Sequence, residues 1–470
     1  MTGPLRRRSV DFRVGLIGIT LGGLALRVGY VLLARRDFPL KGDDFFYHWQ
    51  SRALAEGLGF VNPFSWKALD RLDPTAAHPP LYSLFLAVVS KVGITSPLGH
   101  RLATCVLGAA TVAVVGLVAR RMGSPRAGLL AAGVAAVYPH LWINDGMLIS
   151  ETAYALLIAL VLLATYRWID APSFPRLALV GALVGLASLT RPEAILLLPF
   201  MGVALLFARR GEARGTVTTE GPRTPRRLLA CVVLGATGLL VVTPWLVRNL
   251  TTFEHPVLLA SGHGSVLEIS NCDRTYSGEF LGYWDIRCLT ADRPPASTDQ
   301  ERLLDQASVP GLVYLIAQDE RDESIPDERA RKHGLDYIGD NIERAPLVAL
   351  ARVGRVWSLY RPFQGVDLDT FFERRGLWPS RFGLIMFYAL FALSIWELIA
   401  RWRARRAVWP MLCVIAMTTV TAAISIGITR YRVGSDVVLV VLGGLALDRA
   451  WARARPATPD DTPLEVPSAT

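Results

Sequence analysis

Apolar residues are gathered along this chain into long runs that contain almost no charge. Examples are Leu102–Ala119, Thr152–Thr165 and Leu228–Val247. A helix needs about 20 apolar residues to cross a bilayer, so the pattern predicts an all-α, polytopic membrane protein. The predicted spans are 14–34, 99–119, 126–141, 150–168, 176–190, 192–208, 228–247, 383–401, 408–428 and 433–450.

Arginines lie where the apolar runs end, and the positive-inside rule uses them to orient the spans. With about ten crossings, the basic turns and both termini are expected on the cytoplasmic side. These turns contain Arg6–Arg8, Arg120–Arg126, Arg209–Arg227, Arg401–Arg406 and Arg449–Arg455. The apolar stretch Leu81–Val92 is too short to cross, so we expect a juxtamembrane or half-inserted helix on the outer face.

This topology predicts four parts of the chain. Residues 1–248 form an N-terminal transmembrane module that includes a first outer loop at 35–98. Residues 249–381 form a large outer loop with a juxtamembrane helix, and residues 382–452 form the C-terminal transmembrane helices. The Pro-rich residues 453–470 are expected to be a disordered cytoplasmic tail.

The composition supports a membrane protein. Of the 470 residues, 52% are hydrophobic and 19% are charged, whereas about 25% are charged in typical soluble domains. A soluble enzyme, a disordered chain and a disulfide-dense secreted module are therefore excluded. The net charge of +10 would indicate nucleic-acid binding in a soluble protein. We expect no nucleic-acid partner here, because the arginines lie at the ends of apolar runs and not along one polar face.

The interiors of several apolar runs contain no acid or base, which argues against a transporter with a site at the membrane midplane. Arg27, Glu397 and Asp436 lie towards the ends of predicted helices. There we expect them to extend to the interface or to face an aqueous site. The unusual polar residues gather on the outer side, and the function is expected there.

The first outer loop opens with KGDDFFYHWQSRALAEG at 41–57, in which Asp43 and Asp44 directly follow the first span. A carboxylate at a membrane interface can serve as a general base, with its pKa raised by desolvation or by a neighbouring acid. Capping of the following helix is an equally good explanation for an Asp at this place. In AAHPPLY at 76–82, spacing alone makes His78 an ordinary loop histidine.

Two short outer turns carry further charge. NDGMLISE at 144–151 brings Asp145 and Glu151 to the outer face, although the helix dipole alone would favour Glu151 at a helix start. LTRPE at 189–193 places Arg191 on the outer side, where the positive-inside rule predicts few arginines. Its expected partner is Glu193 or lipid phosphates. PWLVRN and TRYR add Arg248, Arg430 and Arg432 on the same side.

Cys272 and Cys288 both lie in the second outer loop and enclose 15 residues. A disulfide between them is plausible in that oxidising location and would stabilise the loop by about 3 kcal/mol. A metal site is less favoured, because no second Cys or His pair has ligand spacing. Cys105, Cys231 and Cys413 lie in apolar spans and are interpreted as small buried residues.

Together these motifs resemble a GT-C glycosyltransferase of the family-39-like bacterial type, a group with protein O-mannosyltransferases and the lipid A aminoarabinose transferase. The resemblance extends from the first helix to the TRYR region. It is carried by GDDFFYHW, HPPLY, the SET turn, LTRPE, PWLVRN and the NCD…C loop. It implies a GT-C-type helical bundle of about ten transmembrane helices with two large outer loops.

The resemblance also implies roles for individual residues. Asp43 would be the catalytic base, with Asp44 and Glu151 as supporting acids. His78 stands where the aminoarabinose transferase has a phosphate-binding lysine, and Arg191, Arg248 and Arg430 would bind the donor phosphate. No cofactor is required by this scheme, and the DxD pattern of metal-using relatives is absent around Asp43, although a divalent metal is left open.

The sequence therefore predicts an inverting enzyme of the inner membrane that transfers a sugar from a polyprenyl-phosphate donor to an extracytoplasmic acceptor hydroxyl. Two alternatives are a flippase for lipid-linked sugars and a non-catalytic assembly protein. A charged region at 292–345 is a candidate for acceptor specificity. The sugar, the length of the lipid and the class of acceptor stay open.

Overall fold

The computed structural model describes residues 11–207, 224–290 and 321–454. These residues form helices joined by turns, with one isolated antiparallel bridge between Val61 and Pro74. The main bundle is built from α1 (Phe12–Tyr30, continued by the π-helix Val31–Arg35), α5 (Pro97–Met122), α6 (Pro125–Val137), α8 (Glu151–Asp170), α9 (Phe174–Ser188), α10 (Leu197–Phe207), α11 (Thr224–Thr252), α19 (Leu377–Arg403), α20 (Trp409–Ile424) and α21 (Val433–Ala454).

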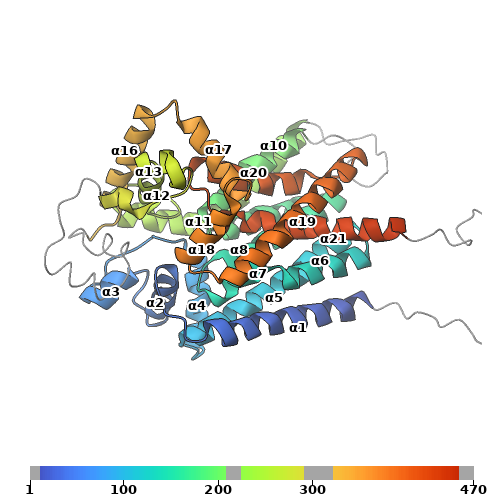
Figure 1. Ribbon diagram of the computed structural model, residues 1–470, viewed down its shortest axis with the longest axis horizontal. Helices are drawn as coiled ribbons and strands as arrows, with labels where there is room; N and C mark the ends of the chain where they lie inside the picture. The colour runs from blue at the N-terminus through green and yellow to red at the C-terminus, as the bar shows by residue number, and fades with distance from the viewer. Residues whose placement is uncertain (1–10, 208–223, 291–320, 455–470) are drawn as a thin grey trace, which may run out of the picture.

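Shorter helices complete the molecule. They are α2 (Asp43–Ala55), α3 (Pro63–Leu69), α4 (Pro80–Lys91), α7 (Pro139–Trp142), α12 (His263–Ser270), α13 (Asp273–Tyr276), α16 (Ser324–Asp340), α17 (Ala345–Val356) and α18 (Pro362–Phe371), with 3-10 turns at Ile143–Gly146 (η2), Pro192–Leu196 (η3), Gly278–Phe280 (η4), Ile286–Thr290 (η5) and Thr429–Arg432 (η6). Figure 1 shows that the short helices gather at one end of the bundle, namely α2, α3, α12, α13 and α16. The N-terminal end of α1 and the C-terminal end of α21 lie at the opposite end.

Most predicted spans correspond to one helix each, whereas the span 126–141 is divided between α6 and α7, which are bent by 67°, and the span 192–208 begins with η3. The helix starts follow local rules. Ser96 and Ser124 accept hydrogen bonds from the backbone N–H groups of Gly99 and Ala127, and Pro97 and Pro125 follow them. Serine at the N-cap and proline at the first helical position are favoured starts. The short apolar stretch Leu81–Val92 lies almost wholly within α4.

The number of spans stays a prediction. Within the described ranges, five helices are long and apolar enough to cross a membrane, or six if the bent pair Pro125–Val137 and Pro139–Gly146 is one span. α9, α10 and α20 are apolar but shorter. The predicted domain limits at 248 and 381 lie within α11 and α19, and the division into domains is likewise untested.

The described parts of three predicted basic turns, at 120–126, 401–406 and 449–454, lie at one end of the bundle. Arg126 at the start of α6 forms an ion pair with Asp448 of α21, and Arg401 of α19 donates to the carbonyl of Met122 at 3.0 Å. The positive-inside rule predicts that this end faces the cytoplasm. Residues 1–10, 208–223, 291–320 and 455–470 lie outside the described residues, and so do the predictions for the N-terminal arginines, the basic loop and most of the tail.

The prediction that Arg27, Glu397 and Asp436 extend to the interface or face an aqueous site is wrong. All three side chains are buried in ion pairs: Arg27 with Asp145 at 2.7 Å, Glu397 with Arg401 at 2.8 Å and Asp436 with Arg432 at 3.1 Å. A charge inside an apolar bundle needs a partner of opposite sign, and a helix neighbour supplies it more closely than a distant interface does.

Candidate active site

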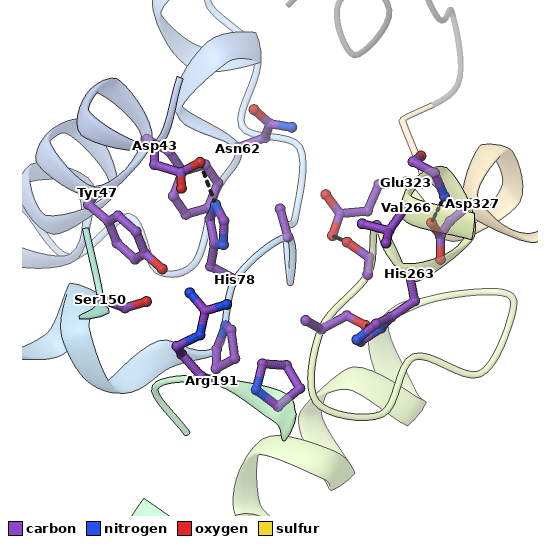
Figure 2. Close-up of a pocket in the computed structure, with 18 of the residues that line it drawn as sticks. Asp43, Tyr47, Asn62, His78, Ser150, Arg191, His263, Val266, Glu323 and Asp327 are labelled. Carbon is purple, nitrogen blue, oxygen red and sulfur yellow. Dashed lines mark hydrogen bonds and ion pairs between the residues drawn. The ribbon is translucent and has the colours of Figure 1, made fainter. Parts of the chain in front are cut away.

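A cavity of about 480 Å³ opens at the end of the bundle where the short helices gather. Its walls come from segments far apart in the sequence (Figure 2), namely the start of α2, the turns before α4, α8 and η3, the helices α12 and α16, and η6. The acids and bases that line it are Asp43, Asp73, His78, Arg191, Glu193, His263, Arg321, Glu323, Asp327, Glu373 and Arg430. Most of the predicted site residues are therefore brought together.

Asp43 is the first residue of α2, and its carboxylate lies at the cavity wall. The N-cap of α2 is Gly42, at φ +57°, so Asp43 does not cap the helix through its side chain. Its Oδ2 accepts a hydrogen bond from Arg430 Nη2 at 2.7 Å, and its Oδ1 lies 3.5 Å from His78 Nε2. Burial acts to raise the pKa of Asp43, but Arg430 and His78 outweigh it and hold that pKa below its usual value. Asp43 is therefore ionised.

Asp44 does not line the cavity. Its side chain is buried and lies 3.8 Å from Arg101 Nη2. Burial raises the pKa of Asp44 to about 6, although Arg101 opposes the shift. The structure thus separates two acids that the sequence could not tell apart, and only Asp43 is available to a bound substrate.

Arg430 is enclosed by carboxylates. Its Nε donates to Glu151 at 2.6 Å, its Nη1 to Glu373 at 2.8 Å and its Nη2 to Asp43 at 2.7 Å. Every nitrogen of the guanidinium is therefore engaged by an acid from a different element. In this state Arg430 fixes the position of Asp43, and only its two remaining N–H groups could contact a phosphate without displacing a carboxylate.

Arg191 shares Glu151 with Arg430. Its Nη1 donates to Glu151 and its Nε donates to Glu193, both at 2.5 Å, and the guanidinium lies 5.0 Å from the centre of the Tyr431 ring. Nη2 has no hydrogen-bond partner within the described ranges, and the side chain points into the cavity (Figure 2). Of the three arginines predicted to bind phosphate, Arg191 is thus the one that lines the cavity with a guanidinium nitrogen that has no partner in the described part of the chain.

His78 is held beside Asp43 by aromatic rings. Its ring stacks on Tyr47 with centroids 4.8 Å apart and meets the edge of Phe46 at 4.7 Å. Pro79 and Pro80 follow it directly, and α4 begins at Pro80. Although spacing alone made His78 an ordinary loop histidine, the structure places it in the cavity.

Arg248, predicted as a phosphate ligand, does not line the cavity. Its Nη1 donates to the carbonyl of Thr75 at 3.0 Å, and its Nη2 donates to the carbonyl of Phe60 at 3.3 Å. The guanidinium also lies near the Trp245 ring. These N–H groups are engaged by backbone oxygens, so Arg248 supports the wall of the cavity from behind.

Several acids at the site escaped sequence reasoning. Glu373 contacts Arg430, and Glu323 and Asp327 form the wall opposite Asp43 (Figure 2). Glu373 lies in FFERRG and Glu323 in DERDES, where neighbouring charges look alike. Burial raises the pKa of Glu373, with Arg430 opposing the shift. No local signal in the sequence marks these residues.

The segment predicted to form the second outer loop contains a disulfide between Cys272 and Cys288, whose Cα atoms are 6.1 Å apart. Trp284, inside the closed loop, lines the cavity. Within the described part of the chain, no group of three or more His, Cys, Asp or Glu side chains is arranged to hold a metal ion. The predicted independence of metal stays untested.

Part of this chain matches a known family. Residues 77–247 match the family model of dolichyl-phosphate-mannose-protein mannosyltransferases. The matched segment contains His78, Glu151 and Arg191 but not Asp43 or Arg430. No curated protein matches the chain.

Solved structures of similar fold include the oligosaccharyltransferase AglB from Archaeoglobus fulgidus. Its complex with an inhibitory peptide and a dolichol-phosphate matches with a TM-score of 0.51 at 16% identity, over 95% of this chain and 52% of AglB. An Archaeoglobus fulgidus oligosaccharyltransferase tethered to an acceptor peptide matches with a TM-score of 0.50 at 15% identity, over 94% of this chain and 50% of the oligosaccharyltransferase. ArnT from Cupriavidus metallidurans bound to undecaprenyl phosphate has a TM-score of 0.39 at 16% identity, over 94% of this chain and 78% of ArnT.

The chain thus has the GT-C fold, and the all-α fold class and the resemblance predicted from the sequence are confirmed, whereas the ten spans and the two outer loops stay predictions. At these identities the likeness to solved structures concerns the fold alone. The chain spans about half the length of the archaeal oligosaccharyltransferases that it matches.

Proposed function

We propose that this protein is an inverting glycosyltransferase that moves a sugar from a polyprenyl phosphate to an acceptor hydroxyl on the extracytoplasmic side of the membrane. One observation carries the proposal. Asp43 is an ionised carboxylate at the wall of a cavity that Arg191 also lines, and Arg430 links the two through Glu151. A base and a cation thus face the same space.

The chemistry of transfer needs these two groups. Asp43 removes the proton of the acceptor hydroxyl, and the oxygen attacks the anomeric carbon from the face opposite the phosphate. The bond between that carbon and the phosphate oxygen breaks, and polyprenyl phosphate leaves with the bonding electrons. Cations stabilise the charge that develops on the phosphate, so no general acid is required. One carboxylate suffices, whereas a glycosidase typically uses two.

Arg191 is the proposed phosphate ligand in the resting state, because its Nη2 is free and its guanidinium faces the cavity. A planar guanidinium suits phosphate recognition. His78, 3.5 Å from Asp43, is placed to contact either the phosphate or the acceptor. Arg430 holds the base in position.

The comparisons support a lipid-linked donor. One AglB structure contains a dolichol-phosphate and a peptide, and the matching family model is that of enzymes named for a dolichyl-phosphate donor. Apolar helices long enough to cross a membrane support a cavity beside the bilayer, where a polyprenyl chain would lie in the lipid. We propose the inner membrane as the location and a glycan, lipid or protein as the acceptor.

The test is incubation of the purified protein with a panel of radiolabelled polyprenyl-phosphate sugars, scoring release of free polyprenyl phosphate. Release by the wild type, lost in Asp43→Asn, is the expected result. Movement of the intact lipid-linked sugar across proteoliposomes without bond cleavage would instead support a flippase. The absence of both activities across the panel would favour an assembly protein.

A further inference from the structure

The two walls of the cavity come from separate outer regions of the chain. Asp43 and His78 belong to the wall built by the first region, and Glu323 and Asp327 belong to the wall opposite (Figure 2). The relative position of the walls decides where an acceptor lies with respect to the base. A side chain that contacts both walls would fix their relative position.

Glu323 joins the two walls. Its Oε2 accepts a hydrogen bond from the Thr75 hydroxyl at 2.7 Å, and its Oε1 accepts one from the backbone N–H of Ala76 at 2.5 Å. Oε1 also accepts from the Ser261 hydroxyl at 2.7 Å. One carboxylate thus connects the turn at Thr75–Ala76 to the far wall, 247 residues further along the chain.

The Thr75–Ala76 turn is buried, and each of its backbone polar groups has a partner. The N–H of Thr75 donates to Phe60 and its carbonyl accepts from Arg248. The carbonyl of Ala76 accepts from the N–H of Ser261, and its N–H donates to Glu323. Removing the carboxylate would leave a buried N–H and a buried hydroxyl without acceptors, a strongly unfavourable state.

His78 follows this turn after a single residue and is itself followed by Pro79 and Pro80. Proline fixes φ and restricts the residue before it, so the segment has little freedom to absorb a movement of the turn. A displacement of Ala76 is therefore transmitted to the His78 ring and to its 3.5 Å contact with Asp43.

We propose that Glu323 is a positioning residue that holds the Thr75–Ala76 turn against the far wall and thereby sets the place of His78 beside Asp43. This inference rests on the proposed function for its catalytic consequence. Its structural content, the coupling of Glu323 to His78, can be measured without turnover.

The first measurement is the rate at which diethyl pyrocarbonate modifies His78 in the full-length protein, followed by mass spectrometry. Glu323→Ala is expected to raise this rate several-fold, because the ring is no longer held on Tyr47. Glu323→Gln keeps an acceptor for Ala76 and Ser261 and should behave like the wild type. Asp322→Asn is the matched control, because Asp322 accepts from the N–H of Glu254 and from Ser324 but does not touch the turn. An unchanged His78 rate in Glu323→Ala would overturn the inference.

The second measurement is a double-mutant cycle on sugar transfer. Glu323→Ala should lower kcat/KM about tenfold in the wild-type background, and it should have no further effect when His78 is already alanine. Additive losses would mean that Glu323 acts independently of His78, and the inference would fail. If the Ala variant does not fold, Thr75→Val removes one contact to Glu323 and should show the same two effects at smaller size. If the wild type shows no transfer, the proposed function fails, and the modification rates alone decide the role of Glu323.

Discussion

Arg430 and Asp43, which are 387 positions apart in the sequence, share a hydrogen bond of 2.7 Å between Nη2 and Oδ2. The contact joins the 3-10 turn before the last helix to the first turn of α2. Its electrostatic effect outweighs burial, so that Asp43 is ionised. A base that is ionised at every physiological pH is available whenever an acceptor enters the cavity.

The first prediction separates the two adjacent acids. Asp43→Asn should lower transfer by about 10²–10⁴-fold, the range usual for loss of a general base. Asp44→Asn should stay within a few-fold of the wild type, because Asp44 lies outside the cavity. Release of free polyprenyl phosphate measures both, with size-exclusion profiles to confirm folding. Equal turnover by Asp43→Asn and the wild type would exclude Asp43 as the base.

The second prediction concerns stability and pH. The pKa of Asp44 is raised from 3.8 to about 6 in the folded protein, so between these values the folded state binds more protons than the unfolded state. The stabilisation is complete below about pH 4 and is lost as the pH rises through 6, a change of about 3 kcal/mol at most. Asp44→Asn imitates the protonated form. Its melting temperature in detergent should exceed that of the wild type at pH 7.5, and the difference should shrink towards pH 4. A constant difference across this range would contradict the assignment.

The third prediction tests the phosphate ligand. Arg191→Lys keeps the charge but loses the planar guanidinium, which contacts Glu151 and Glu193 and also faces the cavity. We expect kcat/KM for the donor to fall by about 10²-fold, as for loss of a donor to a developing oxyanion. Arg52→Lys, in an exposed ion pair on α2, is the control and should have no effect. Equal losses from both variants would argue against a specific contact.

The sequence predicts a site residue only where the residue's position on one side of the membrane already indicates its role. Hydrophobic runs and arginine placement put Asp43, Arg191 and Arg430 on one face, and the structure brings them into one network. Asp43 and Asp44 could not be distinguished, because successive residues of a helix point about 100° apart and the sequence does not show which direction faces the cavity. The roles of Glu323 and Glu373 come from contacts with Ala76 and Arg430, which are 247 and 57 positions away in the sequence. No local sequence pattern predicts such contacts.

The fourth prediction concerns the disulfide. Cys272 and Cys288 close a loop with a sequence separation of 16 that carries Trp284 at the cavity. Replacing both cysteines with serine should lower the free energy of unfolding by about 3 kcal/mol in the chain-entropy model. The melting temperature of the wild type should fall on reduction, while that of the variant should not change. A variant as stable as the oxidised wild type would show that other contacts hold the loop.

The last prediction concerns a glycine beside the buried pair of Arg27 and Asp145. A Cβ at Gly108 of α5 would lie 2.7 Å from Arg27 Nε and 2.9 Å from Asp145 Cγ. Gly108→Ala must therefore push apart two charges that are fully buried, and breaking such a pair costs about 3–5 kcal/mol. Gly133 of α6 has nothing within 4 Å of its Cβ position, so Gly133→Ala should be neutral or stabilise the helix by up to about 1 kcal/mol. The melting temperature of Gly108→Ala should therefore fall, whereas that of Gly133→Ala should stay the same or rise. A small loss in Gly108→Ala would mean that the pair has room to move, and that its close contact with α5 contributes little to the fold.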